Sequence, residues 1–319
     1  MPKIFLSLFF IFNSTLFIWS ADLDEILDKN SITAGIRKLS TATYLGEEFS
    51  NKGFCYDLAN AFAEDLGVDF NLKVIEDFTE YWEKEGKIVF NSNQAVTPDI
   101  YNEIDLAADI FTVSDKRKKY VNMVPFVENT EIFIGKKDLK ISSYEDIRGL
   151  RIFTLESVSF YQLIKDELDA RQIPFVVNPI EADDSGEISF PSGRSAVPEN
   201  GVEIIIIPKD VSYPKFAVYH QLLLDHADLT IQDSFSFFLH YSTSLTFRNG
   251  LRSLFPLRDE TGYLAFCTSY ESEKLNKSLA EFMNRYKKSD EFEILFKQYM
   301  GIGYKDYKSL LNITQQAGN

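Results

Sequence analysis

Apolar residues recur along this chain at two different spacings, and segments of the two kinds alternate. One segment places Leu58, Phe62 and Leu66 at helical spacing on a single stripe, and Gly67 follows where a left-handed helix cap is expected. The run VEIIII at 202–207 has instead the length and β-branched composition of a buried strand. The pattern therefore predicts short helices and short strands in turn.

The same pattern, followed along the whole chain, predicts a series of such elements. The expected strands are residues 32–38, 70–75, 105–111, 131–137, 151–156, 175–178 and 202–207. The expected helices are residues 57–66, 159–168, 214–225, 272–287 and 290–300. Strands that alternate with helices favour an α/β fold with mostly parallel sheets. Residues 181–201 are expected to form an exposed excursion and residues 304–319 a loosely held tail.

The N-terminus has the pattern of a secretory signal peptide. Lys3 precedes the apolar stretch IFLSLFFIF, and the small residues Ser20 and Ala21 precede an acidic run. We expect cleavage after Ser20 and a periplasmic or secreted bacterial protein. An uncleaved anchor is the alternative, but polar residues at 13–15 interrupt a run that is short of the ~20 residues needed to span a bilayer. We expect the mature chain not to be membrane-embedded.

The composition indicates an acidic protein with two lobes. Removal of residues 1–20 removes one Lys and no acid, so the expected mature net charge is 32 − 48 = −16. This balance argues against nucleic acid and anionic membranes as partners. The remaining 319 − 20 = 299 residues exceed the ~100–200 of a typical domain. Two cysteines, Cys55 and Cys267, exclude a disulfide-rich scaffold, and the sequence leaves open whether they pair.

Motifs for catalysis and metal binding are missing from the sequence. The three histidines lack the i, i+4 spacing of a helix-borne zinc site, and none adjoins a cysteine. The chain contains no Gly-rich phosphate loop, no nucleophile elbow and no Cys–His arrangement. We therefore expect no catalytic residues, no metal site and no cofactor.

Two stretches carry a resemblance to a known family. The sequence GFCYDLANAFAEDLGVDFNLKVI at 53–75 predicts a helix, a glycine cap and a strand. The sequence DLAADIFTVSDKRKKYVNMVPF at 105–126 predicts a buried strand that runs into a Thr-x-Ser-x-x-Arg turn. In this order they resemble the extracellular solute-binding proteins, family 3, the polar amino-acid receptors of ABC importers. The segment TYLGEEFSNKGFCYDLANAFAEDLGV also resembles the non-catalytic N-terminal module of membrane-bound lytic transglycosylases.

The resemblance extends over residues 31–301 and implies a particular architecture. This is the α/β, two-lobe periplasmic-binding-protein fold of type II, with the second lobe inserted in the first and a cleft between the lobes. It implies lobe one at residues 21–128 and 250–319, and lobe two at residues 129–249. In the transglycosylases a lysozyme-like catalytic module follows, and the stretch after Gly301 is too short to encode it.

Arg117 is the principal ligand-binding candidate that the resemblance implies. In the family, the arginine of this turn holds a ligand carboxylate with two charge-assisted hydrogen bonds. Thr112 corresponds to a residue that donates from its hydroxyl and backbone N–H, and Ser114 shapes the turn. The alternative is that Arg117 belongs to the solvated charged run DKRKK.

Three further positions correspond to family ligand contacts. Tyr44 lies between the first strand and the first helix, where the family places an aromatic ring against the ligand, although an ordinary surface tyrosine fits as well. Ser157 and Ser159 open the helix after the strand RIFTLE, where N–H groups and hydroxyls suit a carboxylate. Either serine fits equally well as a cap of its own helix.

The chain departs from the family at the position that binds a ligand ammonium. Amino-acid receptors carry an aspartate directly after the hydrophobic strand of lobe two, and Pro208 occupies that position here. Asp210 lies two positions later and reaches the site only through a bulge. The sequence therefore disfavours an ordinary α-amino acid as the ligand.

The sequence favours a non-enzymatic solute-binding protein that captures a small polar, carboxylate-bearing and amino-acid-like ligand for an ABC permease. We expect a monomer that acts by hinged closure of its lobes. Two alternatives stay open. One is a ligand-free interaction or regulatory module of the cell envelope. The other is a cell-wall protein related to lytic transglycosylases that lacks their catalytic domain.

Overall fold

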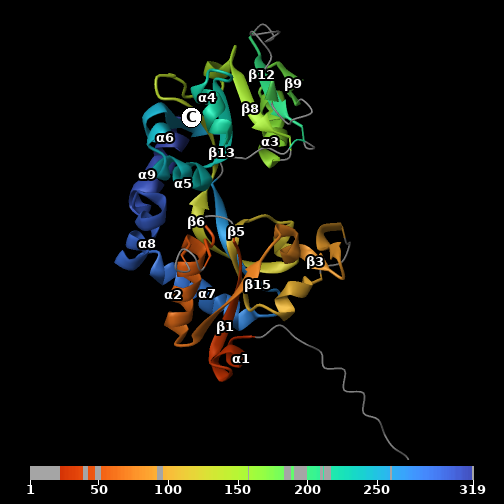
Figure 1. Cartoon of the computed structure of the whole chain (residues 1–319), viewed down its shortest axis with the longest axis vertical. Helices are drawn as coiled ribbons and strands as arrows, with labels where there is room; N and C mark the ends of the chain where they lie inside the picture. The colour runs from red at the N-terminus through yellow and green to blue at the C-terminus, as the bar shows by residue number, and fades with distance from the viewer. Residues whose placement is uncertain are drawn as a thin grey trace, which may run out of the picture.

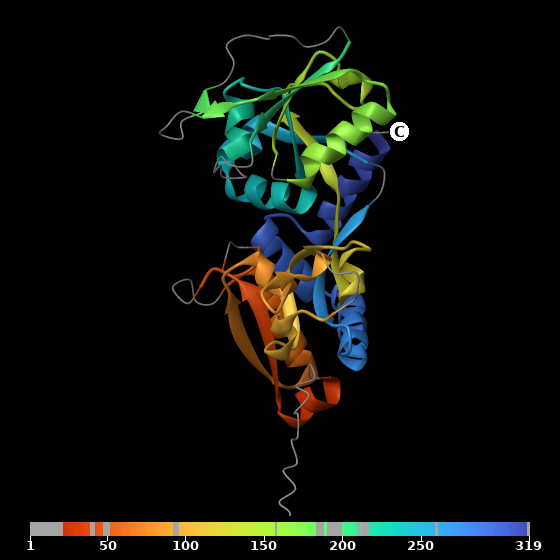
Figure 2. The same cartoon turned by 90° about the vertical axis from the view of Figure 1, so that its right-hand side faces the viewer.

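The protein consists of two lobes stacked along its long axis, each built on its own β-sheet (Figure 1, Figure 2). The computed structural model describes residues 22–38, 42–46, 52–91, 96–156, 158–182, 188–189, 200–208, 211, 217–258 and 261–317. The expected signal peptide, residues 1–20, lies outside the described residues.

The first lobe contains a five-stranded sheet in the order β2-β1-β5-β15-β6. Its strands are β1 (Ser31–Arg37), β2 (Asp69–Ile75), β5 (Leu106–Thr112), β6 (Val121–Asn129) and β15 (Gly262–Ser269). β1 pairs in parallel with β2 and β5, whereas β15 is antiparallel to both β5 and β6. The carboxyl ends of β1, β2, β5 and β6 therefore lie at one edge of the sheet.

Helices cover one face of this sheet, and short 3₁₀ turns cover the other. The helices are α1 (Leu23–Asp28), α2 (Phe54–Leu66), α7 (Glu273–Tyr286) and α8 (Asp290–Met300). The other face carries η2 (Phe78–Trp82), the hairpin of β3 (Glu83–Lys84) and β4 (Lys87–Ile88), η3 (Val89–Asn91) and η4 (Asp99–Asn102). The predicted glycine cap is confirmed, because Gly67 ends α2 at a φ of 71°, and Gly301 ends α8 in the same way at 69°.

The second lobe contains a six-stranded sheet in the order β14-β7-β13-β8-β12-β9. Its strands are β7 (Glu131–Lys136), β8 (Arg151–Leu155), β9 (Phe175–Pro179), β12 (Val202–Ile207), β13 (Leu229–Asp233) and β14 (Leu251–Pro256). Its helices are α3 (Ser159–Ala170), α4 (Val218–Leu223), α5 (Ser234–Thr243) and α6 (Leu245–Gly250), with η6 at Glu145–Ile147. The expected excursion contains a small hairpin of β10 (Glu181–Ala182) and β11 (Ile188–Ser189).

The seven predicted strands are all present, with ends that differ from the prediction by at most one residue. The pattern does not predict β6, β13, β14 and β15. β6 contains Pro125, which cannot donate to a neighbouring strand, and β6 lies at the edge of its sheet, where proline is tolerated. Among the helices, α4 is shorter than predicted and α2 begins three residues earlier, at Phe54.

The C-terminal segment corrects one prediction. The structure shows a helix, α9 (Tyr304–Ala317), where we expected a loosely held tail. Tyr304 is 5% exposed and Tyr307 is fully buried. The prediction is wrong because the rings that bury these tyrosines, such as Phe292 and Phe296 of α8, meet them only in the folded chain.

Sheet membership bears on where the chain crosses between the lobes. β6 belongs to the first sheet and β7 to the second, whereas β14 lies in the second sheet, beyond the expected boundary at residue 249. We propose that the chain crosses near Asn129 and crosses back after Pro256. Lobe two would then extend about one strand further than the sequence suggests.

The two cysteines are free thiols in the first lobe. Cys55 lies in α2 and Cys267 in β15, and both are fully buried. Burial raises the pKa of both thiols, so neither is a reactive thiolate in the folded protein.

Candidate functional site

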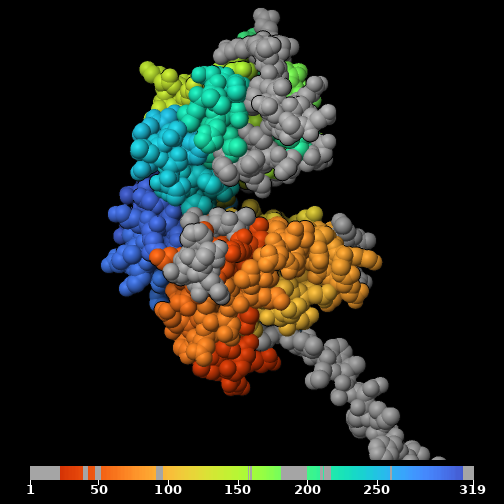
Figure 3. Space-filling model, in the orientation of Figure 1, coloured from red at the N-terminus to blue at the C-terminus, as the bar shows by residue number. Residues whose placement is uncertain are grey.

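The carboxyl ends of the four parallel strands β1, β2, β5 and β6 face the second lobe. β6 ends at this edge with Asn129, and the chain passes directly from there into β7 of the second lobe. β1 ends at the same edge with Arg37, and β5 ends there with Thr112. In open α/β sheets, ligands bind outside the carboxyl ends of the strands. Figure 3 shows that the surface is hollowed here, between the two lobes.

Arg117 lies in η5 (Arg117–Lys119), five residues after the end of β5. Its guanidinium packs against the rings of Trp82 and Phe78, with Cζ at 5.3 and 5.5 Å from the ring centroids. Its Nη1 donates to the backbone carbonyl of Thr112 at 2.8 Å. Within the described part of the chain, no carboxylate lies within salt-bridge distance of this guanidinium. Burial lowers the pKa of Arg117, as expected for a cation that leaves water without gaining a counter-charge.

The turn that carries Arg117 is closed by hydrogen bonds of its own residues. Ser114 Oγ accepts from the backbone N–H of Arg117 at 3.4 Å, and the Ser114 carbonyl accepts from the N–H of Lys118 at 3.0 Å. Ser114 therefore shapes the turn, as the resemblance implies. The side chain of Thr112 is exposed at the end of β5. Its role as a donor to a ligand stays a prediction.

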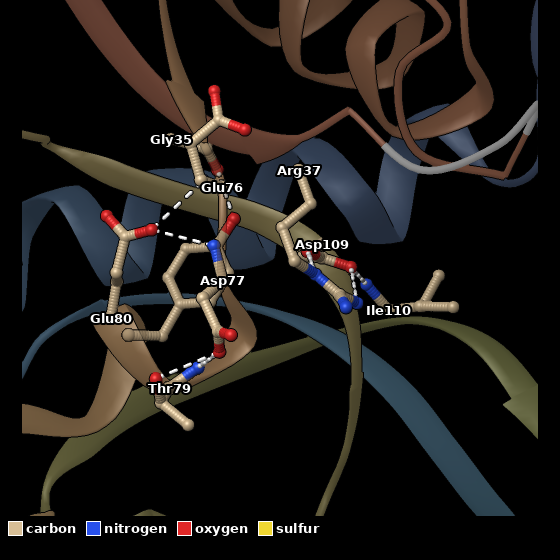
Figure 4. A network of polar contacts seen from close by, with 9 residues as sticks. Gly35, Arg37, Glu76, Asp77, Thr79, Glu80, Asp109 and Ile110 are labelled. Atoms are coloured by element: carbon tan, nitrogen blue, oxygen red, sulfur yellow. Dashed lines mark hydrogen bonds and ion pairs between the residues drawn. The ribbon is translucent and has the colours of Figure 1, made fainter. Parts of the chain in front are cut away.

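A second arginine, Arg37, forms a buried ion pair beside this site (Figure 4). Its Nε and Nη2 donate to the two carboxylate oxygens of Asp109 in β5, at 2.5 and 2.9 Å. The N–H of Ile110 donates to the same carboxylate at 2.7 Å. The Asp109 side chain is 0% exposed and that of Arg37 is 17% exposed. Arg37 also packs over the ring of Phe78, with Cζ 4.7 Å from the centroid.

The two arginines that contact the Phe78 ring differ in their electrostatic state. Burial on its own lowers the pKa of a guanidinium, but the hydrogen bonds and charge of Asp109 raise the pKa of Arg37 above its ordinary value. Arg117 lacks such a partner among the described residues, and its pKa is lowered. Arg37 is therefore a satisfied structural cation, whereas Arg117 retains donors for an external anion.

Hydrogen bonds fix the turn η2 that supplies the aromatic rings. Asp77 Oδ1 accepts from the N–H of Thr79 at 2.7 Å, and Glu80 Oε1 accepts from the N–H of Asp77 at 2.7 Å (Figure 4). These two bonds form a capping box, and the bonds from Thr79 lower the pKa of Asp77. Tyr81 donates from its hydroxyl to the carbonyl of Gly35 in β1 at 3.1 Å. The rings that contact the candidate arginine are thus held in place before any ligand arrives.

Tyr44 lies inside the first lobe. Its ring is 2% exposed and stacks on Tyr56 of α2, with centroids 5.3 Å apart and ring planes at 26°. The structure therefore differs from both expectations, a ring against the ligand and an ordinary surface tyrosine. The start of α2 brings Tyr56 against this ring, a contact that sequence spacing does not reveal.

In the second lobe, α3 follows the carboxyl end of β8. Ser159 is the first residue of α3, and Val158 is its N-cap without a side-chain capping bond. Ser157 and Asp210 lie outside the described residues. The ligand contacts expected of Ser157, Ser159 and Asp210 therefore stay predictions.

The sequence did not single out Phe78, Trp82 or the Arg37–Asp109 pair. A signal was nevertheless present, because parallel strands bring the residues that follow them to one edge of a sheet. Arg37 ends β1, Phe78 follows β2 and Arg117 follows β5. Which guanidinium gains a carboxylate depends on strand register, and this was not visible in the spacing.

Two negative findings apply to the described residues. The described residues include no group of three or more His, Cys, Asp or Glu side chains placed to hold a metal ion. No helix in these ranges has both the length and the apolar character needed to cross a membrane.

Solved structures share the arrangement of both lobes. The L-cystine solute receptor of Neisseria gonorrhoeae, in its unliganded open conformation, is 14% identical with a TM-score of 0.59, and the match covers 89% of this chain and 99% of the receptor. A polar amino acid ABC uptake transporter substrate binding protein from Streptococcus thermophilus is 18% identical with a TM-score of 0.59. This match covers 93% of this chain and 97% of that protein. At these identities the likeness shows the two-lobe fold alone.

Sequence comparison identifies the family. The membrane-bound lytic murein transglycosylase F of Saccharophagus degradans is 28% identical over 146 residues, which are 45% of this chain and 26% of that relative. This chain therefore spans about a quarter of that relative's length. Residues 33–302 match the bacterial extracellular solute-binding proteins, family 3. The match covers most of the chain, and the protein belongs to this family.

Proposed function

We propose that this protein is a receptor for a small polar ligand that bears a carboxylate, bound between the lobes with Arg117 as its main contact. The observation that carries the proposal is that the Arg117 guanidinium is partly buried and has no carboxylate partner among the described residues. It packs on two aromatic rings at the carboxyl edge of the first sheet, and no described carboxylate neutralises it. A half-buried cation of this kind gains free energy when an anion supplies charge-assisted hydrogen bonds.

Other contacts in the proposed site come from both lobes. Thr112 stands exposed beside Arg117 in the first lobe. The start of α3 in the second lobe offers backbone N–H groups, and Ser157, Ser159 and Asp210 belong to the same proposed contact surface. We exclude Tyr44, because its ring is buried against Tyr56.

We also propose that the mature protein is exported and delivers its ligand to an ABC permease. Three observations support this proposal. The family is extracellular, residues 1–20 have the pattern of a signal peptide, and the fold is shared with a substrate-binding protein of an ABC uptake transporter.

A second candidate function is recognition of cell-wall fragments. The observation that favours it is the 28% identity with a lytic murein transglycosylase over 146 residues. A murein fragment with a free carboxylate would use the same Arg117 contact. The two candidates therefore differ in ligand size and not in the charge that is recognised.

A thermal-shift screen followed by calorimetry tests the proposal. The panel contains amino acids, small carboxylic acids, their amides as uncharged controls, and soluble murein fragments. We expect at least one carboxylate to stabilise the protein and the matching amide to be much weaker. The absence of stabilisation by every carboxylate, with a well-folded sample, contradicts the proposal.

Variants of Arg117 test the residue assignment. Arg117→Ala should weaken binding by about 2–5 kcal/mol, and Arg117→Lys should also bind weakly because a single ammonium cannot form two parallel bonds. Lys118→Ala is the matched control, since the Lys118 side chain is 54% exposed and is paired with the exposed Asp115. Equal, small losses for all three variants would show that this turn is merely a charged surface.

A further inference from the structure

The two lobes contact each other through helices on the side away from the hollow. α5 of the second lobe lies against α8 of the first lobe, and α9 packs on α8 and on β14 of the second lobe. In Figure 1, α5, α9 and α8 lie on the left of the molecule, whereas the hollow in Figure 3 opens to the right. The crossing strands are therefore not the sole connection between the lobes.

Aromatic rings form the first part of this contact. Phe235, at the start of α5, has its ring centroid 5.7 Å from that of Phe54 in α2 and 6.3 Å from that of Phe296 in α8. At the other end, a Cβ added to Gly301 would lie 2.4 Å from the Cβ of Ser242 in α5. The apolar core thus runs without interruption from one lobe into the other along α5.

Tyr307 of α9 contacts both lobes and the strand that joins them. Its buried hydroxyl donates to the carbonyl of Glu128 in β6 at 2.7 Å and lies 3.0 Å from Ser234 Oγ in α5. Its ring lies 5.2 Å from Phe296 of the first lobe and 5.7 Å from Phe238 of the second. One side chain therefore joins two helices and a crossing strand that a change of lobe angle would move apart.

Tyr304 adds a second attachment of α9 to the crossing strand. Its hydroxyl donates to the carboxylate of Glu128, and its ring packs on Phe296 with centroids 5.2 Å apart. The Nζ of Lys308 lies 4.0 Å from the other oxygen of the same carboxylate. The first two turns of α9 are thus tied to β6 directly before the chain enters the second lobe.

We propose that α9 is an interlobe brace that sets the angle between the lobes in the ligand-free protein. Rotation of the second lobe would separate the Tyr307 hydroxyl from Ser234 or from Glu128, and a buried polar group without a partner is costly. It would also slide Phe235 and Phe238 over close-packed rings, which resist continuous deformation. The inference concerns the free protein and does not depend on the identity of the ligand.

The test measures the distance between the lobes by electron–electron double resonance without ligand. Spin labels are placed at Lys87→Cys on β4 and at Asp169→Cys on α3, two exposed positions on different lobes. The native cysteines are fully buried and should not be labelled in the folded protein. In the doubly labelled protein, the additional change Tyr307→Phe should shift the distribution of distances between the two labels, or broaden it beyond the width seen with Tyr307 present. We expect this variant to fold, because Ser234 keeps its 3.2 Å bond to Asn129.

Tyr299→Phe is the matched control. Its hydroxyl also makes two bonds, to Asp57 at 2.5 Å and from the N–H of Gly53 at 3.1 Å, but both partners belong to the first lobe. This variant should leave the distance distribution unchanged. Two results overturn the proposal: an unchanged distribution in Tyr307→Phe, or an equal change in Tyr299→Phe.

A second variant keeps the proposal testable if Tyr307→Phe fails to fold. Phe238→Leu retains an apolar side chain in α5 but removes the edge contact with the Tyr307 ring. The brace predicts a shifted or broadened distribution for this variant too, and an unchanged one counts against it. A loss of ligand binding in the Arg117 variants, by contrast, would leave the free-protein distances as they are.

Discussion

Asp109→Asn should lower the free energy of unfolding by about 3 kcal/mol, because it breaks a buried ion pair. The change keeps the shape of the side chain but removes the charge that pairs with Arg37. Asp109 accepts three N–H donors, two from Arg37 and one from Ile110, and an amide with one acceptor oxygen cannot serve all of them. Removing one partner of a buried pair costs ~3–5 kcal/mol, and the 17% exposure of Arg37 places the expected value at the lower end.

Urea unfolding followed by tryptophan fluorescence measures this loss. The sequence has two tryptophans, and after removal of residues 1–20 the remaining one is Trp82, in the first lobe. Asp105→Asn is the matched control, since Asp105 is 4% exposed and is paired with Lys29 at 2.9 Å. The Lys29 side chain is 40% exposed, so its charge stays solvated and we expect a loss of about 1 kcal/mol.

Either of two outcomes would contradict this prediction. Losses of equal size for the two variants would show that the exposure of the cationic partner does not decide the cost. A smaller loss of unfolding free energy in Asp109→Asn than in the control would show that Arg37 finds enough water, or another partner, once the charge of Asp109 is removed.

Two further predictions concern glycines at which a side chain would be strained, and the pH dependence of stability. Gly53→Ala should destabilise the protein by about 3 kcal/mol, because the new Cβ would lie 2.1 Å from the carbonyl oxygen of Thr43. Gly86→Ala, where nothing lies within 4 Å but φ is +71°, should cost about 1 kcal/mol, and thermal unfolding that ranks the two in reverse order contradicts the argument. Burial lowers the pKa of His240 below its ordinary 6.5, so its contribution to stability is present above pH 6.5 and is lost as the pH falls below that value. His240→Gln should therefore flatten the decline in unfolding free energy below pH 6.5, and parallel pH curves for wild type and variant would count against this assignment.

Local regularities in the sequence predicted most of the elements that carry the candidate site. The apolar stripe of α2 and its glycine cap depend on neighbouring residues alone, because helix periodicity and a left-handed cap are local properties. The β-branched run of β12 likewise identified a buried strand with its observed ends. β14 was missed because its short apolar run is broken by the exposed Arg252 and the half-buried Ser253, and β15 was missed because its last six residues are all buried and show no alternation of polar and apolar positions.

The candidate site was predictable in part for the same reason. Arg117 was found because its turn motif is local, and the turn has the hydrogen bonds that such a motif implies. The partners of Arg117 were not found, because Phe78 and Trp82 reach it from a different strand end. Tyr44 was misjudged because its exposure depends on a ring supplied by α2.

The sequence by itself determined the α/β class, most strand and helix positions, the acidic balance and the turn that presents Arg117. Tertiary structure alone decided which arginine is neutralised, since Arg37 and Asp109 are 72 residues apart and meet through the parallel pairing of β1 and β5. It also decided that the C-terminal residues form α9, because Tyr307 gains its partners from β6, α5 and α8 only after both lobes have formed. Periodicity reports the face that a segment must bury, and it does not report which distant segment covers that face.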